Sequence, residues 1–448
     1  MSSTTDVDVL ILGAGLAGLA CAHALEGSGL SYRVLEKDAR VGGLAKTNVR
    51  HGNYHFDITG HWLHIKKPEV KALVGNLLGD ELVPRVRKAR IFSHGVYTHF
   101  PFQANTHGLP KEVAAECILG FLQARTHDVL GTTPPPSHPA PQTFADYILQ
   151  RMGPGIAKHF MFPYNTKIWT VHPREMDASW CDRFVPIPSV EDVINGALGL
   201  SKEAMGYNVE FLYPRQGGIG RVPEAIRAHC TGPFDHGVTP VRVDLKTRTV
   251  TTNDGRTLHY RHLFNSIPLP ELVGTLTECP DEVRTAARSL RWTTITYYDV
   301  AAKDHGAEVP HWVYLPEEKF KFYRVGSFTA VEPRMAPPGT RTFYVEYSHK
   351  AGEGFDEKTG AEAAVKGLVE MGLVRSPEDI IFAEAARIPV AYAIQGADQN
   401  AAKKVVLDYL GAQGVRSAGR YGAWYYSSME DAIWDGLRLA REMREAPR

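Results

Sequence analysis

The chain has 448 residues, more than a single hydrophobic core usually holds, and this length predicts about three domains. Lys and Arg together number 50, as do Asp and Glu, so no net positive charge favours nucleic acid as a partner. The five cysteines are scattered and form no C-x-x-C pair. This pattern argues against a disulfide framework or a zinc site and favours a reducing cytoplasm as the location.

An apolar stretch near the start of the chain, "DVDVLILGAGLAGLACAHAL", resembles a secretory signal in its hydrophobicity. It lacks a basic leading region and begins with acidic residues, so we interpret it as part of the folded protein. No apolar run reaches the roughly 18 residues that a membrane span needs. We therefore expect no contact with a membrane.

Residues 7–38 have the order strand, Gly-rich turn, helix, strand. Gly13, Gly15 and Gly18 occupy the G-x-G-x-x-G positions, and Glu36 ends the second strand. In this arrangement the glycines allow a pyrophosphate to approach the helix N-terminus, and the acid accepts hydrogen bonds from ribose hydroxyls. The pattern predicts a dinucleotide site, and the alternative is a Gly-rich turn within a core sheet.

The segment "EKDARVGGLAKT" favours FAD over NAD as the dinucleotide. Its Arg40, Gly42 and Gly43 follow the ribose acid directly and resemble the extended signature of the FAD-binding amine-oxidase-like superfamily. In that superfamily a second turn lies against the flavin pyrophosphate. A surface turn is the alternative explanation for the two glycines.

The rest of the chain divides into segments of different periodicity. Residues 239–268 read as three strands with an Asp-Gly turn, and residues 415–443 as a strand, a Gly-rich turn and an amphipathic helix. Residues 108–200 are helical in pattern, with a Pro-rich connection at 131–142. Residues 285–350 alternate apolar and polar side chains, which is typical of antiparallel strands.

These segments predict an α/β fold with a Rossmann-like FAD-binding domain, a helical insertion and an antiparallel-sheet substrate domain. The predicted domains are an FAD-binding domain (1–90 with 212–275 and 405–448), a helical substrate-gating domain (106–205) and a sheet domain (91–105 with 276–404).

Longer motifs make the chain resemble the UDP-galactopyranose mutases, and the eukaryotic-type branch more than the bacterial one. The resemblance rests on "DITGH", "FPFQAN", "TFADYILQRMGPGIAKHFMFPYNTKIW", "WCDRFVPIP", "YPRQGGIG", "WVYLPEEKFKFYR" and "GRYGAWYY", in this order along nearly the whole chain. "PYNTKIW" and "FYR" are more specific than the FAD fingerprint.

The resemblance implies a non-redox isomerisation of a UDP-sugar between pyranose and furanose rings. In that family reduced FAD is required, and the sugar is held covalently on flavin N5 while its ring opens and recloses. NADPH or NADH is a possible reductant. The expected partner is the nucleotide-sugar substrate, with no nucleic acid and no membrane, and an oligomer is possible.

The resemblance also assigns roles to individual residues. Two arginines form a clamp for the diphosphate, because a planar guanidinium can contact two phosphate oxygens at once. The implied catalytic residues are Gly60, His61, Arg183, Arg324 and Arg420, and the substrate-binding residues are Phe100, Gln103, Asn165, Trp169, Asn208, Tyr314, Tyr392 and Tyr426. The implied cofactor-binding residues are Gly13, Gly15, Leu16, Ala17, Gly18, Glu36, Lys37, Arg40, Gly43, Leu44, Gly60, His61, Val243, Gly419, Arg420, Tyr426, Ser428 and Met429.

The stretch "DITGHWLHI" contains two histidines, His61 and His64, that could suggest a metal site. By the resemblance, the Gly60 carbonyl accepts a hydrogen bond from reduced flavin N5, and His61 lies against the flavin on the face away from the sugar. His64 has no such role and is expected to be structural. No cluster of acidic partners completes a metal site, so none is predicted.

Two other functions remain open from the sequence. One is an FAD-dependent oxidase or desaturase of the amine-oxidase type, and the other is a non-enzymatic flavoprotein that senses nucleotides. The arginine pair and Asn208 favour the mutase, since an amine or apolar substrate has no use for them. Taken singly, an arginine is usually a surface or paired residue, and Trp169 and Trp424 fit a core better than a stack against the substrate.

Overall fold

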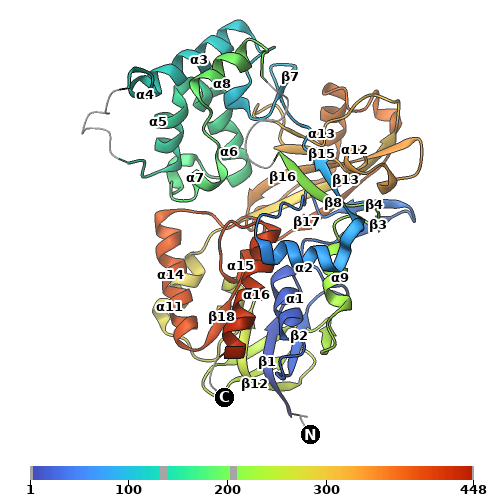
Figure 1. Ribbon diagram of the computed structural model, residues 1–448, viewed down its shortest axis with the longest axis vertical. Coiled ribbons are helices and arrows are strands. Elements are labelled where there is room, and N and C mark those ends of the chain that lie inside the picture. The colour runs from blue at the N-terminus through green and yellow to red at the C-terminus, as the bar shows by residue number, and fades with distance from the viewer. Residues whose placement is uncertain (1–3, 132–139, 202–208, 446–448) are drawn as a thin grey trace.

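The computed structural model describes residues 4–131, 140–201 and 209–445. Figure 1 shows a lower lobe that contains both β1 (Thr4–Leu12) and the last helix, α16 (Met429–Glu445). Above it lie a helical lobe and a second lobe built on a sheet. The expected mixed α/β fold is therefore confirmed.

The lower lobe is built on a seven-stranded sheet with the order β10–β11–β12–β1–β2–β9, and β18 pairs with β12. β1 pairs in parallel with both β2 and β12, and β10 and β11 are added as antiparallel strands. This arrangement confirms the predicted βαβ unit and the three strands predicted for 239–268. The remaining bounds are β2 (Tyr32–Glu36), β9 (Phe234–His236), β10 (Pro240–Asp244), β11 (Thr249–Thr252), β12 (Thr257–Asn265) and β18 (Val415–Ser417).

Helices α1 (Leu16–Leu25) and α16 pack closely against one another on this sheet. A Cβ on Gly436 of α16 would overlap the Ala17 carbonyl oxygen, so the two backbones are in contact. The predicted closing helix is thus confirmed, and it brings the end of the chain next to the Gly-rich turn at the start.

The second sheet also has seven strands, in the order β17–β13–β16–β15–β14–β6–β7. All neighbouring pairs are antiparallel except β14 with β6. The antiparallel strands predicted within 285–350 are confirmed. Their bounds are β6 (Ala89–Ser93), β7 (Val96–His99), β13 (Thr293–Lys303), β14 (Trp312–Tyr314), β15 (Arg324–Ser327), β16 (Thr340–Lys350) and β17 (Ile380–Ile388).

The helical lobe contains the helices predicted for 108–200, and the apolar side chains of this lobe pack on one face of the second sheet. Residues 132–139 of the Pro-rich connection lie outside the described residues. The helices are α3 (Lys111–Ala124), α4 (Thr126–Leu130), α5 (Phe144–Ile156), α6 (Phe162–Trp169), α7 (Cys181–Phe184) and α8 (Val190–Ala197).

The remaining elements refine the predicted domain boundaries. α10, α11 and α14 pack on the lower lobe, so residues 276–290 and all of α14 belong with the first sheet rather than the second. β6 spans the predicted boundary at 90/91 and belongs to the second sheet. The elements not yet given are β3 (Thr47–Arg50), β4 (Tyr54–Asp57), α2 (Pro68–Leu78), β5 (Leu82–Val86), β8 (Glu210–Pro214), α9 (Arg221–Ala228), α10 (Leu269–Thr275), α11 (Asp281–Ser289), α12 (Phe328–Val331), α13 (Glu357–Glu370), α14 (Ala397–Ala412) and α15 (Gly419–Gly422).

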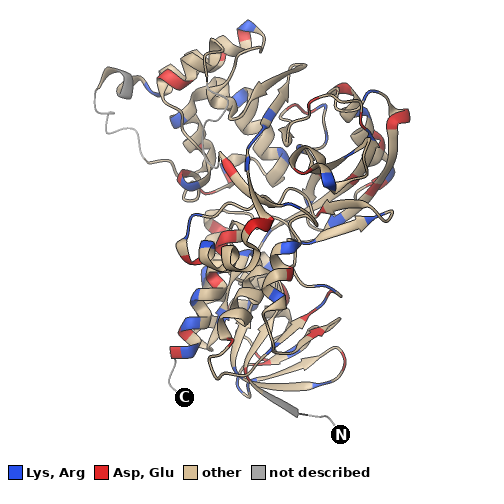
Figure 2. Ribbon diagram, turned by 45° about the vertical axis from the view of Figure 1, so that its right-hand side comes forward, with Lys and Arg blue, Asp and Glu red and all other residues tan. Residues whose placement is uncertain are grey.

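Charged residues of both signs are interspersed over the elements of all three lobes (Figure 2). This distribution agrees with the equal numbers of basic and acidic residues in the sequence. Among the described residues, no helix combines the length and the apolar character needed to cross a lipid bilayer.

Helices α3 and α5 approach each other closely at Gly155, and this contact can be tested. A Cβ on Gly155 would overlap the Glu116 carbonyl oxygen. We predict that Gly155→Ala lowers the stability by about 1–3 kcal/mol, because the helices must separate to admit the methyl group. The measurement is the thermal unfolding temperature of the purified variant.

Gly75→Ala is the matched control. Gly75 lies in α2 and is exposed, and a Cβ added there would have no atom of the described residues within 4 Å. Alanine there should leave the stability unchanged or raise it by up to ~1 kcal/mol. Equal unfolding temperatures for the two variants would contradict the glycine-mediated contact.

Candidate functional site

The Gly-rich turn between β1 and α1 forms a cradle that is open toward a ligand. Gly15 is the N-cap of α1, and the first turn of this helix, all of it within the described residues, has neither a side-chain cap nor an acidic residue. A Cβ on Gly15 would have Gly43 Cα, at 4.0 Å, as its nearest neighbour in the described structure. The positive end of the helix is therefore uncompensated and accessible to an anion.

The other two glycines of the motif serve packing and backbone geometry. A Cβ on Gly18 would overlap the Gly13 carbonyl oxygen, so Gly18 lets the helix approach the strand. Gly13 has φ +93°, in the region that favours glycine. Leu16 and Ala17 are only 6% and 4% exposed, so what they can offer an anion is their backbone N–H groups.

A second glycine turn lies against the first. Gly42 and Gly43 both have positive φ, and the Gly42 N–H donates to the Ala14 carbonyl over 2.8 Å. A Cβ on Gly43 would lie 3.2 Å from Gly15 Cα, so the two turns stack directly. Leu44, the next residue, is partly buried against the core of the helical lobe. The extended signature seen in the sequence thus corresponds to a double-turn cradle.

Glu36 lies at the end of β2 beside this cradle and is buried, with 5% of its surface exposed. Its carboxylate accepts from the Ala14 N–H (2.7 Å) and the Asp38 N–H (2.9 Å), and each oxygen retains acceptor capacity for a ribose hydroxyl. Lys37 is exposed. Arg40 donates to the Thr47 carbonyl over 2.8 Å and so braces the loop itself.

The C-terminal segment completes the cradle. Gly419, at the start of α15, is close to α1, because a Cβ added to it would lie 3.1 Å from Ala17 Cβ. Arg420 donates to the Ser427 carbonyl, and Ser428 and Met429 begin α16. Gly419 therefore lies beside the first turn of α1, and Arg420 and Ser428 lie at the turn that leads into α16.

Val243 lies on β10 and has no exposed surface, and its carbonyl accepts from the Thr277 N–H over 2.9 Å. The pairing of β10 with β11 shifts register between Pro240 and Arg242, and the neighbouring Val241 is 52% exposed. The role of Val243 in cofactor binding stays a prediction.

The Gly60 loop faces the second sheet. A Cβ on Gly60 would overlap the Tyr344 hydroxyl, which has no hydrogen-bond partner among the described residues. His61 is partly buried, and its Nδ1–H donates to the Ile58 carbonyl over 2.7 Å. Burial, together with the positive charge of Arg420, lowers the pKa of His61 to about 4. His61 is therefore neutral at physiological pH, with Nε2 as its acceptor nitrogen.

His64 is placed by a hydrogen bond between its Nδ1 and the Glu210 carbonyl, 2.9 Å apart. Within the described part of the chain, no group of three or more His, Cys, Asp or Glu residues is arranged to hold a metal ion.

Aromatic residues from all three lobes form one cluster, which we call the aromatic chamber and which consists of Tyr164, Trp169, Tyr314, Tyr392 and Tyr426. The Trp169 ring lies 5.4 Å from Tyr392 and 5.6 Å from Tyr426, and Tyr164 makes an edge contact with Tyr314 at 5.3 Å. The Arg420 guanidinium lies 5.5 Å from the Tyr392 ring and 5.2 Å from the Tyr426 ring. Burial raises the pKa of Tyr314 and of Tyr392, so both hydroxyls stay protonated and can donate to an anion.

Arg324 is held by a buried carboxylate. It lies on β15 directly opposite Glu346 of β16, and its guanidinium donates to both Glu346 oxygens, one of them at 2.9 Å. Burial alone would lower the pKa of Arg324, but the Glu346 carboxylate outweighs it and holds that pKa well above its usual value. Tyr314 lies opposite Arg324 on β14. The three side chains therefore form a row on one face of the sheet.

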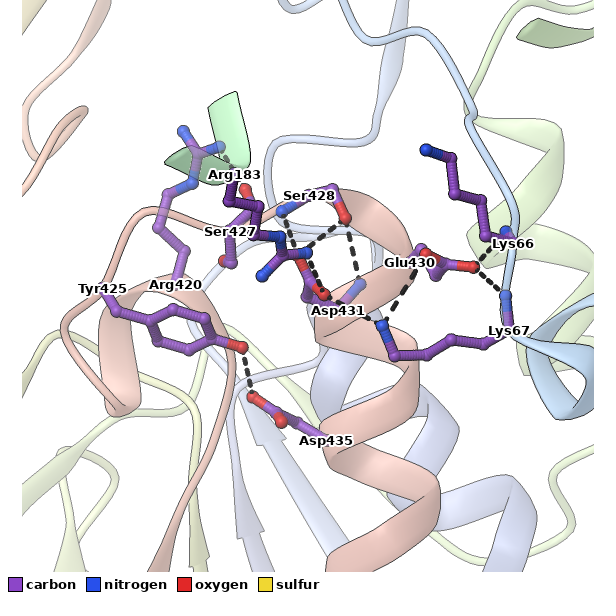
Figure 3. Close-up of polar contacts among 10 residues, drawn as sticks. All are labelled: Lys66, Lys67, Arg183, Arg420, Tyr425, Ser427, Ser428, Glu430, Asp431 and Asp435. Atoms are coloured by element: carbon purple, nitrogen blue, oxygen red, sulfur yellow. Dashed lines mark hydrogen bonds and ion pairs between the residues drawn. The ribbon is translucent and has the colours of Figure 1, made fainter. Parts of the chain in front are cut away.

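Arg183 has a different partner, shown in Figure 3. Its Nη2 contacts both oxygens of Asp431, at 2.8 and 2.7 Å, in the first turn of α16. Arg183 is also a neighbour of the aromatic chamber, since its guanidinium lies 4.9 Å from the Phe184 ring and that ring lies 4.8 Å from Tyr426. Arg183, Arg324 and Arg420 thus border one chamber.

The remaining predicted substrate residues have mixed surroundings. Phe100 lies 5.2 Å from Tyr314, and its ring also contacts the Arg87 guanidinium at 4.6 Å. Gln103 and Asn165 are 3% and 8% exposed, and their amide groups donate to the Pro186 and Met161 carbonyls. They brace the chamber in this structure. Asn208 lies outside the described residues.

Sequence reasoning missed several residues of the chamber. Glu346 stands in the otherwise apolar run "TFYVEYS", and a charge at such a position is a signal of a buried ion pair. Lys167, inside the motif "PYNTKIW", donates to the Leu315 and Glu317 carbonyls at 2.7 and 2.8 Å and so holds the loop between β14 and β15. The roles of Asp431 and Tyr344 had no local signal.

Comparison with known proteins found related sequences and similar folds. A match to putrescine oxidase from Kocuria rosea is 32% identical over 139 residues, 30% of this chain and 28% of that protein. A crystal structure of reduced UDP-galactopyranose mutase superposes with a TM-score of 0.89 at 22% identity, covering 97% of this chain and 93% of the other. A structure of putrescine oxidase superposes with a TM-score of 0.66 at 16% identity, covering 98% and 99%.

The model of the family described as flavin containing amine oxidoreductase matches residues 16–444. This range begins directly after Gly15 and includes the second glycine turn, the Gly60 loop and almost all of the C-terminal helix. Because it extends over well more than half of the chain, the protein belongs to the flavin containing amine oxidoreductase family.

Proposed function

We propose that the protein isomerises a nucleotide sugar, with UDP as the nucleotide, between its pyranose and furanose forms in a non-redox reaction of the eukaryotic UDP-galactopyranose mutase type. The observation that carries the proposal is the set of Arg183, Arg324 and Arg420 around one tyrosine-rich chamber beside the Gly60 loop. Such a set suits a diphosphate attached to a sugar.

The residues of the cradle fit FAD. Gly15 leaves room for a pyrophosphate at the α1 N-terminus, and Glu36 is positioned for a ribose. In its reduced form, maintained by NADPH or NADH, FAD would supply an electron-rich nitrogen as the nucleophile toward the anomeric carbon. The Gly60 carbonyl would hold the proton on that nitrogen, and neutral His61 would add no positive charge beside it.

The chain's own groups would bind and orient the leaving diphosphate. Arg183 and Arg324 would contact its oxygens, and the protonated Tyr314 and Tyr392 would donate further hydrogen bonds. Because Arg324 and Tyr392 are largely buried, their interaction with the anion is stronger than it would be in water. The remainder of the substrate site would be lined by Phe100, Gln103, Asn165, Trp169 and Tyr426.

Amine oxidation is the second candidate, since the family and the partial match to putrescine oxidase favour it. The electrostatics of the chamber argue against it. An ammonium substrate would meet the guanidinium groups of Arg324 and Arg420, and Glu346 is already paired with Arg324. A cationic substrate would therefore be repelled where an anionic one is attracted.

The direct test is to incubate dithionite-reduced protein with UDP-galactose or UDP-arabinopyranose and to determine the ring size of the product by NMR. We expect furanose product from at least one substrate and none from the corresponding sugar 1-phosphate, which lacks the diphosphate. Oxidation of putrescine without any ring-contracted sugar would instead support the oxidase.

The cradle gives a prediction about the cofactor. Gly15→Val should abolish FAD retention, because the added side chain would occupy the space left for the pyrophosphate while its Cβ meets no atom of the described residues closer than 4.0 Å. The measurement is the flavin absorbance per protein after gel filtration. Circular dichroism checks that the variant is folded, and full flavin occupancy in a folded variant would refute the placement.

The two clamp arginines require different substitutions. Arg183 has a half-exposed side chain, so Arg183→Ala should preserve the fold and FAD while weakening UDP binding by about 2–5 kcal/mol. Arg324→Ala would leave Glu346 buried without its cation, at a cost of about 3–5 kcal/mol in stability, so Arg324→Lys is the better probe. Lysine keeps the charge but loses the planar fork, and UDP binding should weaken.

Isothermal titration with UDP measures both effects. Arg438→Ala is the control, because Arg438 is exposed and pairs with Glu442 one turn along α16. Wild-type UDP affinity in both the Arg183→Ala and Arg324→Lys variants would show that the diphosphate binds elsewhere.

A further inference from the structure

Arg183 is already neutralised by a carboxylate before any ligand arrives. Its Nη2 contacts both oxygens of Asp431, and 46% of its side chain is exposed against 7% for Asp431. A diphosphate at Arg183 must therefore compete with Asp431 for the same guanidinium. A clamp made of the two arginines alone would not predict this competition, because it leaves Asp431 out.

Asp431 can release Arg183 without becoming an isolated buried charge. One of its oxygens accepts from the Ser428 N–H (2.9 Å) and the Ser428 hydroxyl (2.8 Å), and Lys67 Nζ lies 3.3 Å from the other. Figure 3 shows Lys67 approaching Asp431 from the side opposite Arg183. Asp431 also lies in the first turn of α16, where the helix dipole stabilises a negative charge.

Arg183, in turn, is positioned to move toward the chamber. It comes from the short helix α7, in the lobe opposite α16, and its guanidinium already lies against Phe184, which contacts Tyr426. Arg420 donates to the Ser427 carbonyl immediately before Ser428, so the two arginines flank the same turn. A short movement of the Arg183 side chain would therefore exchange the Asp431 carboxylate for a diphosphate as its partner.

We propose that Asp431 is the resting partner of Arg183 and sets the affinity of the site for diphosphate, and that Lys67 keeps Asp431 neutralised when Arg183 transfers to the ligand. Asp431 thus acts through Arg183 as a positioning residue and does not itself bind the substrate. The inference rests on the proposed function, because it takes Arg183 as a diphosphate ligand.

The proposal predicts that removal of a carboxylate strengthens binding. In Asp431→Asn, Arg183 is no longer held, and the fraction of protein competent to bind rises. We expect UDP to bind roughly two- to fivefold more tightly, the change that corresponds to loss of a partly exposed ion pair. Asp431→Asn would also tighten UDP binding simply by removing the repulsion between the Asp431 carboxylate and the diphosphate. The same substitution must therefore also be measured in a protein that lacks Arg183.

The test is a double-mutant cycle, measured by isothermal titration of the FAD-loaded protein with UDP and with inorganic pyrophosphate. Asp431→Asn should tighten binding when Arg183 is present and change it less than twofold in the Arg183→Ala background. Glu442→Gln removes a charge from the exposed part of α16 and should have no effect. Equal tightening in both backgrounds, or no tightening with Arg183 present, would overturn the proposal.

Lys67→Met is a second variant, and we expect it to change the UDP affinity in the opposite direction. It tests the proposal on its own if Asp431→Asn fails to fold. Without Lys67, Asp431 should hold Arg183 more firmly, so UDP should bind more weakly, again only when Arg183 is present. Tighter or unchanged binding would overturn the proposal. If wild-type protein binds neither UDP nor pyrophosphate, the proposed function fails with it, whereas binding without coupling to Arg183 defeats this inference alone.

Discussion

The ion pair between Arg324 and Glu346 is the interaction on which the rest of the chamber depends. Glu346 is completely buried in the middle of the second sheet, where a carboxylate without a cation would be very unfavourable. Strand register places Arg324 directly opposite it, and Tyr314 and Tyr297 extend the same row on either side. The carboxylate therefore fixes the guanidinium, which lies 5.7 Å from the Tyr323 ring and 5.9 Å from the Tyr344 ring.

The Arg324 guanidinium can remain charged beside the aromatic chamber because the Glu346 carboxylate neutralises it. Glu346 already holds the Arg324 guanidinium in place. An anionic ligand that binds Arg324 therefore requires little movement of this side chain. Arg183 is arranged differently, with a more exposed side chain and a partner on another lobe. One arginine is thus fixed and the other can exchange partners, and together they border the space next to the double glycine turn.

The sequence predicted those parts of the fold and site that depend on local pattern. The G-x-G-x-x-G turn, the acid at the end of β2, the three strands after residue 239 and the final helix all follow from short-range periodicity and glycine geometry. The arginines were found only through their resemblance to a family, since a single arginine carries no local signal. Their clustering around one chamber then follows from the fold.

Contacts between residues that are far apart in the sequence could not be predicted, because they depend on how helices and strands pack against one another. Arg183 and Asp431 are separated by 248 residues, and their contact depends on how α7 meets α16. The register shift in β10 has no signal in the periodicity of the sequence. The packing of α11 on the first sheet has none either, because its apolar face could have packed on either sheet.

We propose that this flavoprotein acts on an anionic nucleotide sugar without net oxidation. This can be tested by measuring oxygen uptake during turnover of UDP-galactose and, separately, of putrescine, with the product of each reaction identified. We expect furanose product to form only after prior reduction of the flavin and to keep forming anaerobically for many turnovers, with no oxygen consumed in proportion to product. Oxygen uptake stoichiometric with amine oxidation, and no ring-contracted sugar from the reduced protein, would contradict it.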